Sequence, residues 1–387
     1  MTSRTAVQFG AGNIGRGFLA QLFYESGLEI VFVDVDERVL EAMEARKEYV
    51  IQIVGEGADE VSIRNLRASH AKEREQIAQE IAECEVVCTA VGANALKFVA
   101  PTLAQGILLR NQTSGKSLNV LLCENLHGAA EVLKNAIAEY LPAEQCEILL
   151  ANVGFVQAVV SRMVPIPTPE EREADPLAIR VEAYKRLPID ANAVVGTLPE
   201  IVGVIPVSNF LAHVERKLYA HNCAHAVLGY VGHARGHTYG YEAMEDTEIE
   251  ILLQHVLTET GAALIFKHGF DPKEQEAHIK DLLRRFLNRN LGDTCIRLSR
   301  DPLRKLAYDD RLVGSARLCE AFHVSYESLV KVIAMALHHQ DPDDPKTNEL
   351  QSLIKEKGIE ATVEQVCRVR AEEPLGVAIL SEWRKTK

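Results

Sequence analysis

The sequence predicts an α/β fold: an N-terminal doubly wound parallel sheet followed by a mostly α-helical C-terminal domain. Three observations support this. A strand, a glycine-rich turn, a helix and a second strand ending in an acid follow one another between Thr5 and Asp34. Later continuous apolar runs are typical of buried parallel strands. From about Phe210 onward the pattern is helical almost throughout. We expect one domain over residues 1–200 and another over residues 201–387.

Length and composition are those of an ordinary soluble globular protein. The 387 residues are too many for one small core, and 47% are hydrophobic and 25% charged. The net charge of −13 argues against general affinity for nucleic acid or for an anionic membrane. An anionic substrate would therefore need a local basic pocket. No signal segment and no apolar run near 18 residues is evident, so we expect no membrane association.

Cysteine usage indicates a reducing compartment. The eight cysteines are scattered singly, mostly inside apolar runs, and none forms a CxxC pair. Buried free thiols in the cytoplasm are the expected state. There is no HExxH motif and no Cys/His cluster with zinc spacing, so no metal site is expected.

The first strand leads directly into a dinucleotide-binding, Rossmann-type turn. Residues 5–9 alternate like a strand and are followed by the sequence GAGNIGRG. In this pattern Gly10 permits the tight turn, Gly12 lets the backbone approach a pyrophosphate, and Gly15 lets helix and strand pack closely. The helix N-terminus then offers free N–H groups to the phosphates. The residues expected to bind the cofactor are Phe9, Gly10, Ala11, Gly12, Asn13, Ile14, Gly15, Arg16, Gly17 and Asp34.

Asp34 indicates which dinucleotide is bound. It ends the second strand, residues 29–33, at the position where a carboxylate accepts hydrogen bonds from the adenosine ribose. A carboxylate there would repel a 2′-phosphate, so NAD is expected rather than NADP.

Two later runs, residues 85–91 and 118–123, predict further buried strands. Asn125 follows the second of them, before the helical stretch 129–140. Ligands of doubly wound sheets bind at the carboxyl ends of the strands, so its amide could face the nicotinamide. Asn is also a common helix N-cap, and position alone favours that role.

The rest of the first half is less informative. Residues 151–164 resemble more strand and are followed by a proline-rich segment. The charged run 170–175 predicts a solvated loop, and residues 178–184 alternate like an edge strand.

Residues 214–230, VERKLYAHNCAHAVLGY, predict one amphipathic helix. Its expected buried stripe consists of Leu211, Val214, Leu218 and Leu228. The same face carries Lys217, with His221, His225 and Asn222 about 40°, 80° and 140° round from it. Burial of these groups without partners is costly, and a buried lysine tends to lose its proton. The alternative is that they cap neighbouring elements or extend out of the core.

A basic cluster lies further along this acidic chain. It consists of Arg297, Arg300, Arg304, Lys305 and Arg311. Most are expected to be surface charges that form ion pairs with Asp301, Asp309 and Asp310. One or two could instead clamp a phosphate, because guanidinium matches phosphate oxygens in a bidentate fork. A second candidate group is Arg284, Arg285 and Arg289.

Several segments together resemble the polyol-specific long-chain dehydrogenases, the mannitol dehydrogenase family. They are QFGAGNIGRGF, FVDVD, CENLHGA, ERKLYAHNCAHA and RDPLRKLAYDDRL, and the resemblance spans nearly the whole chain. The family carries a Lys-x4-Asn-x2-His signature, which is met here by Lys217, Asn222 and His225. One departure is Ser161, which stands in a segment, VVSRMVP, where members often have an acid.

The resemblance implies a Rossmann domain, a helical substrate domain and metal-free chemistry with NAD. It implies reversible oxidation of D-mannitol 1-phosphate to D-fructose 6-phosphate, in the cytoplasm, by a monomer or a weak homodimer. Lys217 would be the general base, its pKa lowered by burial beside His221 and near Arg216. Asn222 and Asn125 would donate to the developing oxyanion, and His225 would orient a substrate hydroxyl.

Two alternatives stay open. A relative that acts on unphosphorylated mannitol, or on a hexuronate such as tagaturonate or fructuronate, would share the same signature. A nucleotide-binding sensor without chemistry would keep the cofactor fold alone, but it would have no need of a buried base.

Overall fold

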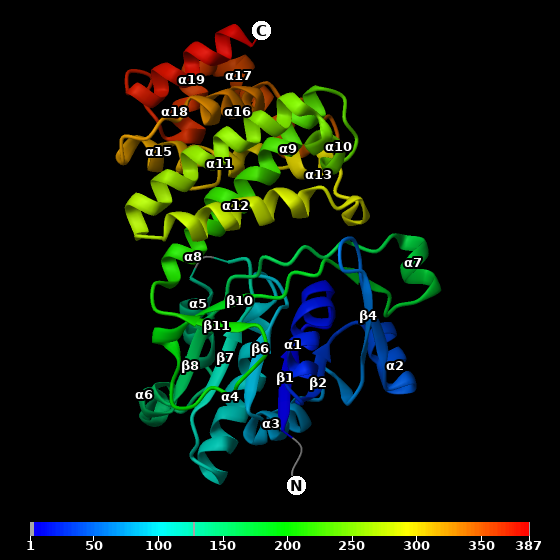
Figure 1. Ribbon diagram of the computed structural model, residues 1–387. Helices are drawn as coiled ribbons and strands as arrows, with labels where there is room; N and C mark the ends of the chain where they lie inside the picture. The colour runs from blue at the N-terminus through cyan, green and yellow to red at the C-terminus, as the bar shows by residue number, and fades with distance from the viewer. Residues whose placement is uncertain (1–3, 127, 387) are drawn as a thin grey trace. The chain divides into compact units, whose positions relative to one another are not determined.

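The computed structural model describes residues 4–126 and 128–386, and the chain divides into two compact units, Met1–Phe210 and Leu211–Lys387 (Figure 1). Every strand named in the described residues belongs to the first unit. These strands are β1 (Thr5–Phe9), β2 (Glu29–Asp34), β3 (Tyr49–Ile53), β4 (Asp59–Ile63), β5 (Leu66–His70), β6 (Val86–Thr89), β7 (Leu118–Leu122), β8 (Val153–Gln157), β9 (Ile179–Val181), β10 (Leu187–Asp190) and β11 (Val204–Val207). Its helical elements are the π-helical turn η1 (Gly15–Leu19), α1 (Ala20–Glu25), α2 (Glu37–Arg46), α3 (Arg74–Glu83), α4 (Leu96–Thr113), α5 (Ala129–Ala138), α6 (Ala143–Ala151), α7 (Pro169–Ala174) and the short turn η2 (Ala191–Ala193).

Six parallel strands form the central sheet of the N-terminal unit. Their spatial order is β5-β2-β1-β6-β7-β8, and β1 pairs with β2 on one side and with β6 on the other. Counted along the chain within this sheet, the order is third, second, first, fourth, fifth, sixth, as in dinucleotide-binding folds. The strand order reverses between β1 and β6, where such folds bind their ligands. The predicted doubly wound sheet is confirmed.

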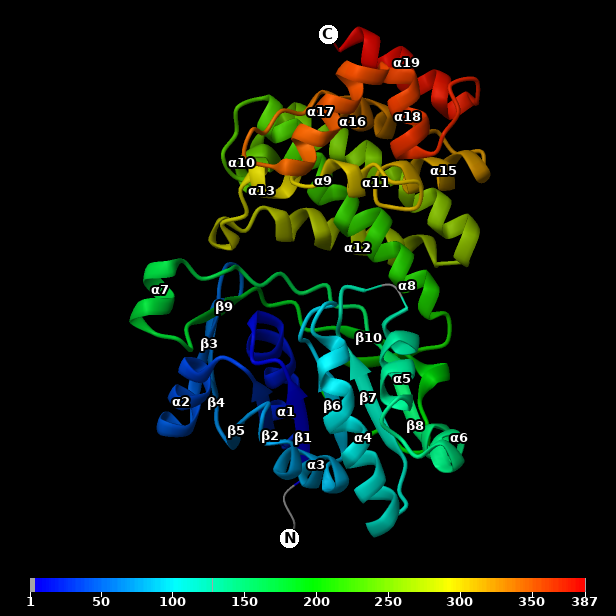
Figure 2. The same cartoon turned by 180° about the vertical axis from the view of Figure 1, so that it is seen from behind.

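Side chains of alternate strand residues build a core on each face of this sheet. Ala6, Ile30 and Phe32 pack with η1, α1 and α2 on one face. Val7 and Val31 pack with α3, α4 and α5 on the other (Figures 1 and 2). The period of two along each strand therefore supplies both faces, which explains why these strands are continuous apolar runs.

Two smaller sheets and a short helix complete the unit. Strand β9 pairs with β3 at the edge of the sheet β4-β3-β9, so the predicted edge strand is confirmed, and β10 pairs with β11. Of residues 151–164, only β8 is a strand. The prediction of a loop over residues 170–175 was wrong, because α7 begins there. Thr168 and Glu171 form a capping box, and Pro169 occupies the first turn.

The C-terminal unit is built from helices (Figure 2). They are α8 (Phe210–Arg216), the π-helical turn η3 (Lys217–Asn222), α9 (Cys223–Ala234), α10 (Gly240–Glu245), α11 (Thr247–His268), α12 (Pro272–Phe286), the short turn η4 (Arg289–Leu291), α13 (Cys295–Ser299), α14 (Pro302–Lys305), α15 (Val313–Ala321), α16 (Glu327–His338), α17 (Pro345–Lys357), α18 (Ile359–Cys367) and α19 (Pro374–Lys385). Helix α9 is the most buried of them and packs against α10, α11, α13 and α16. Gly229 lets α13 approach, because a Cβ there would lie 2.6 Å from the Leu298 carbonyl carbon.

Helix α11 is long and apolar enough to cross a membrane by length and composition alone. Half of that window is buried, and α11 packs against α9, α12, α15 and α16. It is therefore better described as a core helix of this unit. The eight cysteines are all free, and all but Cys146 are buried, as the sequence predicts.

Helices α3 and α4 meet so closely that one glycine is required. A Cβ at Gly106 would lie 2.6 Å from Cβ and Cγ2 of Ile81. We expect Gly106→Ala to lower the free energy of unfolding by about 1–2 kcal/mol, because overpacking outweighs the gain in helix propensity. Urea unfolding followed by circular dichroism measures the change. Gln112→Ala, at an exposed position on the same helix, should shift stability by less than about 0.5 kcal/mol. A Gly106→Ala protein more stable than the parent would contradict this packing.

Candidate active site

The glycine turn after β1 combines one tight bend, one close approach and one open position. Gly10 has φ of +95°, and a Cβ there would lie 2.4 Å from the Ala90 carbonyl oxygen. A Cβ on Gly15 would lie 1.9 Å from the carbonyl oxygen of Gly10, so the turn and the helix can meet only without side chains. Gly12 is exposed, and a Cβ there would meet nothing within 4 Å. The exposed backbone of Gly12 is therefore open to a ligand.

The helix that follows this turn does not begin as a regular α-helix. Residues Gly15–Leu19 form a π-helical turn, in which the Ala20 N–H donates to the carbonyl of Gly15, five residues back. Within it Arg16 and Gly17 are buried, and burial lowers the pKa of Arg16. The sequence pattern predicts the helix but contains no signal for this extra residue per turn.

Asp34 connects β2 to the glycine turn. Its Oδ2 accepts a hydrogen bond from the Ala11 N–H at 2.5 Å, and its Oδ1 accepts from the N–H groups of Val35 and Asp36. A carboxylate has about four acceptor sites, so one remains for a ligand hydroxyl. The side chain is only partly buried and stands at the carboxyl end of β2.

At the carboxyl end of β7, Glu124 and Asn125 have different roles. The Glu124 carboxylate accepts hydrogen bonds from the N–H groups of Val91 and Gly92 and so holds the loop after β6. Asn125 is exposed in the bend that follows. It does not cap a helix: α5 begins at Ala129 with Gly128 as its N-cap and no side-chain cap bond. The capping alternative for Asn125 is therefore wrong. Glu124 was missed in the sequence, where a carboxylate after a strand carries no separate signal.

The signature lysine and asparagine lie in a second π-helical turn rather than in one regular helix. Helix α8 ends at Arg216, η3 spans Lys217–Asn222, and α9 begins at Cys223. The Cys223 N–H donates to the carbonyl of Leu218, five residues back. An i→i+5 turn moves residues five apart toward the same side of the helix, so Asn222 lies closer to the Lys217 face than 140°. The predicted helix over residues 214–230 is confirmed, since α8, η3 and α9 follow one another without a break, but its uniform spacing of 100° per residue was wrong, because no composition rule reports an inserted residue.

The predicted apolar stripe was also wrong in part. Leu228 is buried, but Leu211 is 55% exposed, and Val214 and Leu218 are only partly buried. The stripe assumed a uniform 100° per residue, which fails across η3.

Lys217 is partly buried and has a perturbed pKa. Burial first, and then repulsion from the Arg311 guanidinium, lowers the pKa of Lys217 to about 8. The expected influence of Arg216 was wrong, since Arg311 is the cation that acts on Lys217, and the Arg216 guanidinium lies over the Phe270 ring at 4.5 Å. Burial also lowers the pKa of His221 well below its usual value, so this neighbour is uncharged at neutral pH and adds no positive charge beside Lys217.

His225 and His221 form a ring cluster with Phe286 of α12. The two imidazoles meet edge to face with centroids 4.8 Å apart, and Phe286 lies 4.8 Å from His225 and 5.7 Å from His221. Burial, followed by four cations, lowers the pKa of His225 to about 3. Those cations are, in order of effect, Arg297, Arg311, Arg285 and Lys305. His225 is therefore a neutral imidazole in a region of positive potential.

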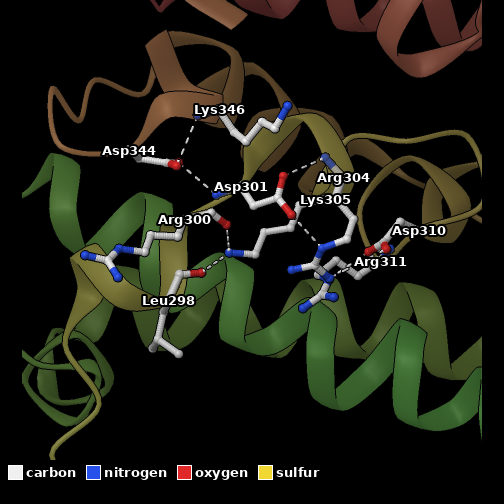
Figure 3. A network of polar contacts seen from close by, with 9 residues as sticks. All are labelled: Leu298, Arg300, Asp301, Arg304, Lys305, Asp310, Arg311, Asp344 and Lys346. Atoms are coloured by element: carbon white, nitrogen blue, oxygen red, sulfur yellow. Dashed lines mark hydrogen bonds and ion pairs between the residues drawn. The ribbon is translucent and has the colours of Figure 1, made fainter. Parts of the chain in front are cut away.

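The basic cluster divides into paired and unpaired members (Figure 3). Arg304 pairs with Asp301 at 2.7 Å and Arg311 pairs with Asp310 at 2.7 Å, while Arg297 pairs with Asp293. The prediction that most members are surface charges paired with nearby acids is confirmed in part. Three members are paired, with Asp293 rather than Asp309 as the third partner, but Lys305 is buried and the Arg311 side chain is only 11% exposed. The ion pairs of the second group are Arg284 with Asp281, Arg285 with Asp281, and Arg289 with Glu245. Arg300 is exposed and makes no ion pair among residues 4–126 and 128–386.

Lys305 is a buried member of the cluster. Its Nζ donates to the main-chain carbonyls of Leu298, at 2.6 Å, and of Arg300 (Figure 3). Burial, Arg311 and Arg304 lower the pKa of Lys305 to about 7. Through these bonds Lys305 holds the backbone that presents Arg300.

The proposed catalytic residues are divided between the two units. Asn125 belongs to Met1–Phe210, and Lys217, Asn222 and His225 belong to Leu211–Lys387. In the described part of the chain, no three His, Cys, Asp or Glu side chains are grouped as a metal site would require. Ser161 is partly buried. His127, within the CENLHGA segment, lies outside the described residues.

Comparison with known proteins gives consistent matches over the whole chain. The mannitol dehydrogenase Rossmann domain model matches residues 4–203, and the mannitol dehydrogenase C-terminal domain model matches residues 209–373. A mannitol-1-phosphate 5-dehydrogenase of Bacillus subtilis is 36% identical over 378 residues, covering 97% of this chain and 99% of that protein. One of Brevibacillus brevis is 37% identical over 383 residues, covering 99% and 98%.

Two solved structures share the fold at low sequence identity. One is the Pseudomonas fluorescens mannitol 2-dehydrogenase ternary complex with NAD and D-mannitol, with a TM-score of 0.74 at 16% identity, covering 99% of this chain and 92% of that one. The other is a D-sorbitol dehydrogenase in substrate-free form, with a TM-score of 0.81 at 17% identity and coverages of 99% and 93%. With both domain models and full-length relatives in agreement, the chain belongs to the mannitol dehydrogenase family of oxidoreductases.

Proposed function

We propose that this protein oxidises D-mannitol 1-phosphate to D-fructose 6-phosphate with NAD, and catalyses the reverse reduction. The observation that carries the proposal is the set of cations around Lys217 and His225 in a chain of net charge −13. Concentrating positive charge at one place in an acidic protein favours an anionic substrate. The names of the relatives, at 36–37% identity, support a phosphorylated polyol.

We propose NAD as the cofactor, bound at the glycine turn. The exposed backbone of Gly12 suits a pyrophosphate, and the remaining acceptor site of Asp34 suits a ribose hydroxyl. A 2′-phosphate beside the Asp34 carboxylate would be repelled. When bound, the nicotinamide takes up the hydride from the reacting carbon.

The eight free cysteines support a reducing, cytoplasmic location.

In the proposed mechanism Lys217 acts as a neutral amine. It accepts the proton of the substrate hydroxyl while the hydride leaves the same carbon, so the alcohol becomes a carbonyl. Asn222 and Asn125 donate side-chain N–H groups to the oxygen as negative charge develops. The neutral imidazole of His225 orients a neighbouring hydroxyl. For reduction, protonated Lys217 returns the proton.

The substrate is tested by NADH oxidation at neutral pH with fructose 6-phosphate, fructose and tagaturonate. We expect turnover with the phosphate ester and about 10- to 100-fold lower kcat/KM with fructose, because a charged hydrogen bond is lost. If only fructose or tagaturonate were turned over, the proposed role of Lys217 would stand, but the proposed substrate would be wrong and one of the alternative substrates would replace it. No turnover with any of the three would remove the proposal.

The pKa of Lys217 predicts the pH dependence of both directions. Oxidation needs the neutral amine, so its kcat/KM should rise with pH and level off above about 8. Reduction needs the ammonium, so its kcat/KM should fall as pH rises through about 8. Lys217→Met should abolish both. A Lys217→Met enzyme with parental rates would show that another group is the base.

Loss of activity in Lys217→Met should be accompanied by a gain in stability. In the folded protein Lys217 titrates near 8 instead of 10.5, so holding the ammonium costs free energy at every pH below about 8. We expect Lys217→Met to raise the free energy of unfolding at pH 7 by about 1–3 kcal/mol, and the gain to shrink as pH rises toward 10.5. Urea unfolding at pH 7 and pH 10 separates this result from misfolding, which would lower stability.

We propose Arg300 as the phosphate ligand, because its exposed guanidinium has no acidic partner in the described chain and Lys305 holds its backbone. Arg300→Met should raise KM for fructose 6-phosphate by about 10- to 100-fold and leave the slow rate with fructose unchanged. Arg304→Met is the matched control, since Asp301 already occupies that guanidinium. If only the Arg304 variant loses affinity for the phosphate, the assignment to Arg300 is wrong.

A further inference from the structure

Two consecutive carbonyls of the π-helical turn η1 accept hydrogen bonds from buried side chains elsewhere in the N-terminal unit. The Tyr49 hydroxyl, from β3, donates to the carbonyl of Arg16 at 2.8 Å. The Arg162 guanidinium, from the segment after β8, donates through Nη1 to the carbonyl of Gly17 at 3.1 Å. Both donors are only 4% exposed. We call Tyr49 and Arg162 the turn clamp.

Such external donors matter at a π turn. An inserted residue interrupts the i→i+4 ladder, and interruptions of this kind occur where a side chain enters it. Buried carbonyls left by the interruption need other partners. The turn clamp places side-chain donors on the carbonyls of Arg16 and Gly17, directly after the Gly15 carbonyl that accepts the i→i+5 bond, so we expect it to favour the π geometry over a regular α-helical turn.

Arg162 makes several specific polar contacts in addition to those with η1 described above. Its Nε donates to the carbonyl of Glu182 at 2.8 Å, and its Nη1 also donates to Oε1 of Gln21 at 2.7 Å. Its guanidinium lies 5.5 Å from the centre of the Phe18 ring. Burial lowers the pKa of Arg162 to about 10, opposed by the charges of Glu182 and Glu25. A buried cation is costly, and two of the three hydrogen bonds named for Arg162 go to η1 and α1.

The π-helical turn η1, to which the turn clamp donates, lies between two segments that other contacts fix in place. On one side, the Gly10 N–H donates to the carbonyl of Val33, and Gly15 fits directly against Gly10. On the other, Leu22 and Phe23 lock α1 into the core. If the π turn relaxed to α geometry, the residues before it would rotate by roughly one position, about 100°, relative to α1.

We infer that Tyr49 and Arg162 are positioning residues for the cofactor: by imposing the π turn, they set the direction of the free N–H groups of residues 12–15. Those groups face the pyrophosphate in the proposed NAD site, on which this inference rests. The turn clamp does not touch the reacting atoms, so its contribution is to cofactor affinity rather than to the chemical step.

The test measures the Kd of NADH by its fluorescence, together with kcat at saturating NADH. Arg162→Met should raise Kd by about tenfold or more, because the two charged donations to η1 and α1 are lost together with the one to Glu182, and Arg162→Lys should recover part of it. Tyr49→Phe should raise Kd by about three- to tenfold, since one neutral hydrogen bond is lost. The kcat at saturation and the pH profile should match the parent protein. Arg64→Met is the control, because Arg64 pairs with Glu48 at the surface of the same unit.

Several outcomes would overturn the inference. Arg162→Met with lower stability in urea but an unchanged Kd would show a purely structural role. If Arg162→Met does not fold, Tyr49→Phe decides, and an unchanged Kd there also overturns the inference. A parent protein that does not bind NADH would remove the proposed cofactor itself. That result can be distinguished from a failure of the inference on Tyr49 and Arg162, because it is measured on the parent protein before any substitution.

Discussion

An extra residue in a helical turn is the constraint on which both candidate sites depend. In the N-terminal unit, η1 lies between the Gly10–Gly15 contact and the buried helix α1. In the C-terminal unit, η3 begins at Lys217 and ends at Asn222. In each case the π turn changes which backbone or side-chain groups share a face, and π turns of this kind are frequent at functional sites. In a regular α-helix the same residues would point in other directions around the helix axis.

The N-terminal turn shows how backbone chemistry and buried polar chemistry combine. Glycines remove the side chains that would otherwise separate the turn from the sheet, and the carboxylate of Asp34 ties the turn to β2. The buried side chains of Tyr49 and Arg162 then donate to two consecutive carbonyls of η1. Close packing and specific hydrogen bonding thus act on the same turn.

The electrostatics of the C-terminal unit follow from burial more than from ion pairing. Lys217, His225 and Lys305 all have lowered pKa values with burial as the main cause, and neighbouring cations add to it. His225 is neutral at physiological pH, and the lowered pKa values of Lys217 and Lys305 raise the fraction of neutral amine there, which suits a base and a hydrogen-bonding imidazole. Arg304 and Arg311 are each paired with an acidic side chain, which offsets part of the positive charge of this region.

The fold class and the candidate residues could be read from the sequence, because they rest on local rules. Strand alternation, the glycine spacing before Asp34 and the helical pattern after Phe210 each depend on near neighbours in the chain. The same holds for the motif that contains Lys217, Asn222 and His225. Short-range signals that were overlooked, such as the capping box at Thr168, belong to this class too.

Only the tertiary structure decided the features that depend on contacts between residues far apart in the sequence. The π turns depend on the packing around them, and the hydrogen bonds of Tyr49 and Arg162 to η1 span 33 and 145 residues. The choice of Arg311 rather than Arg216 as the cation acting on Lys217, and the pairing of each arginine with its acid, follow from how the helices pack. Sequence periodicity assumes a uniform helix and carries no information about such contacts. The residue types and the lowering of the Lys217 pKa by burial were therefore predictable, while the geometry and the neighbouring cations were not.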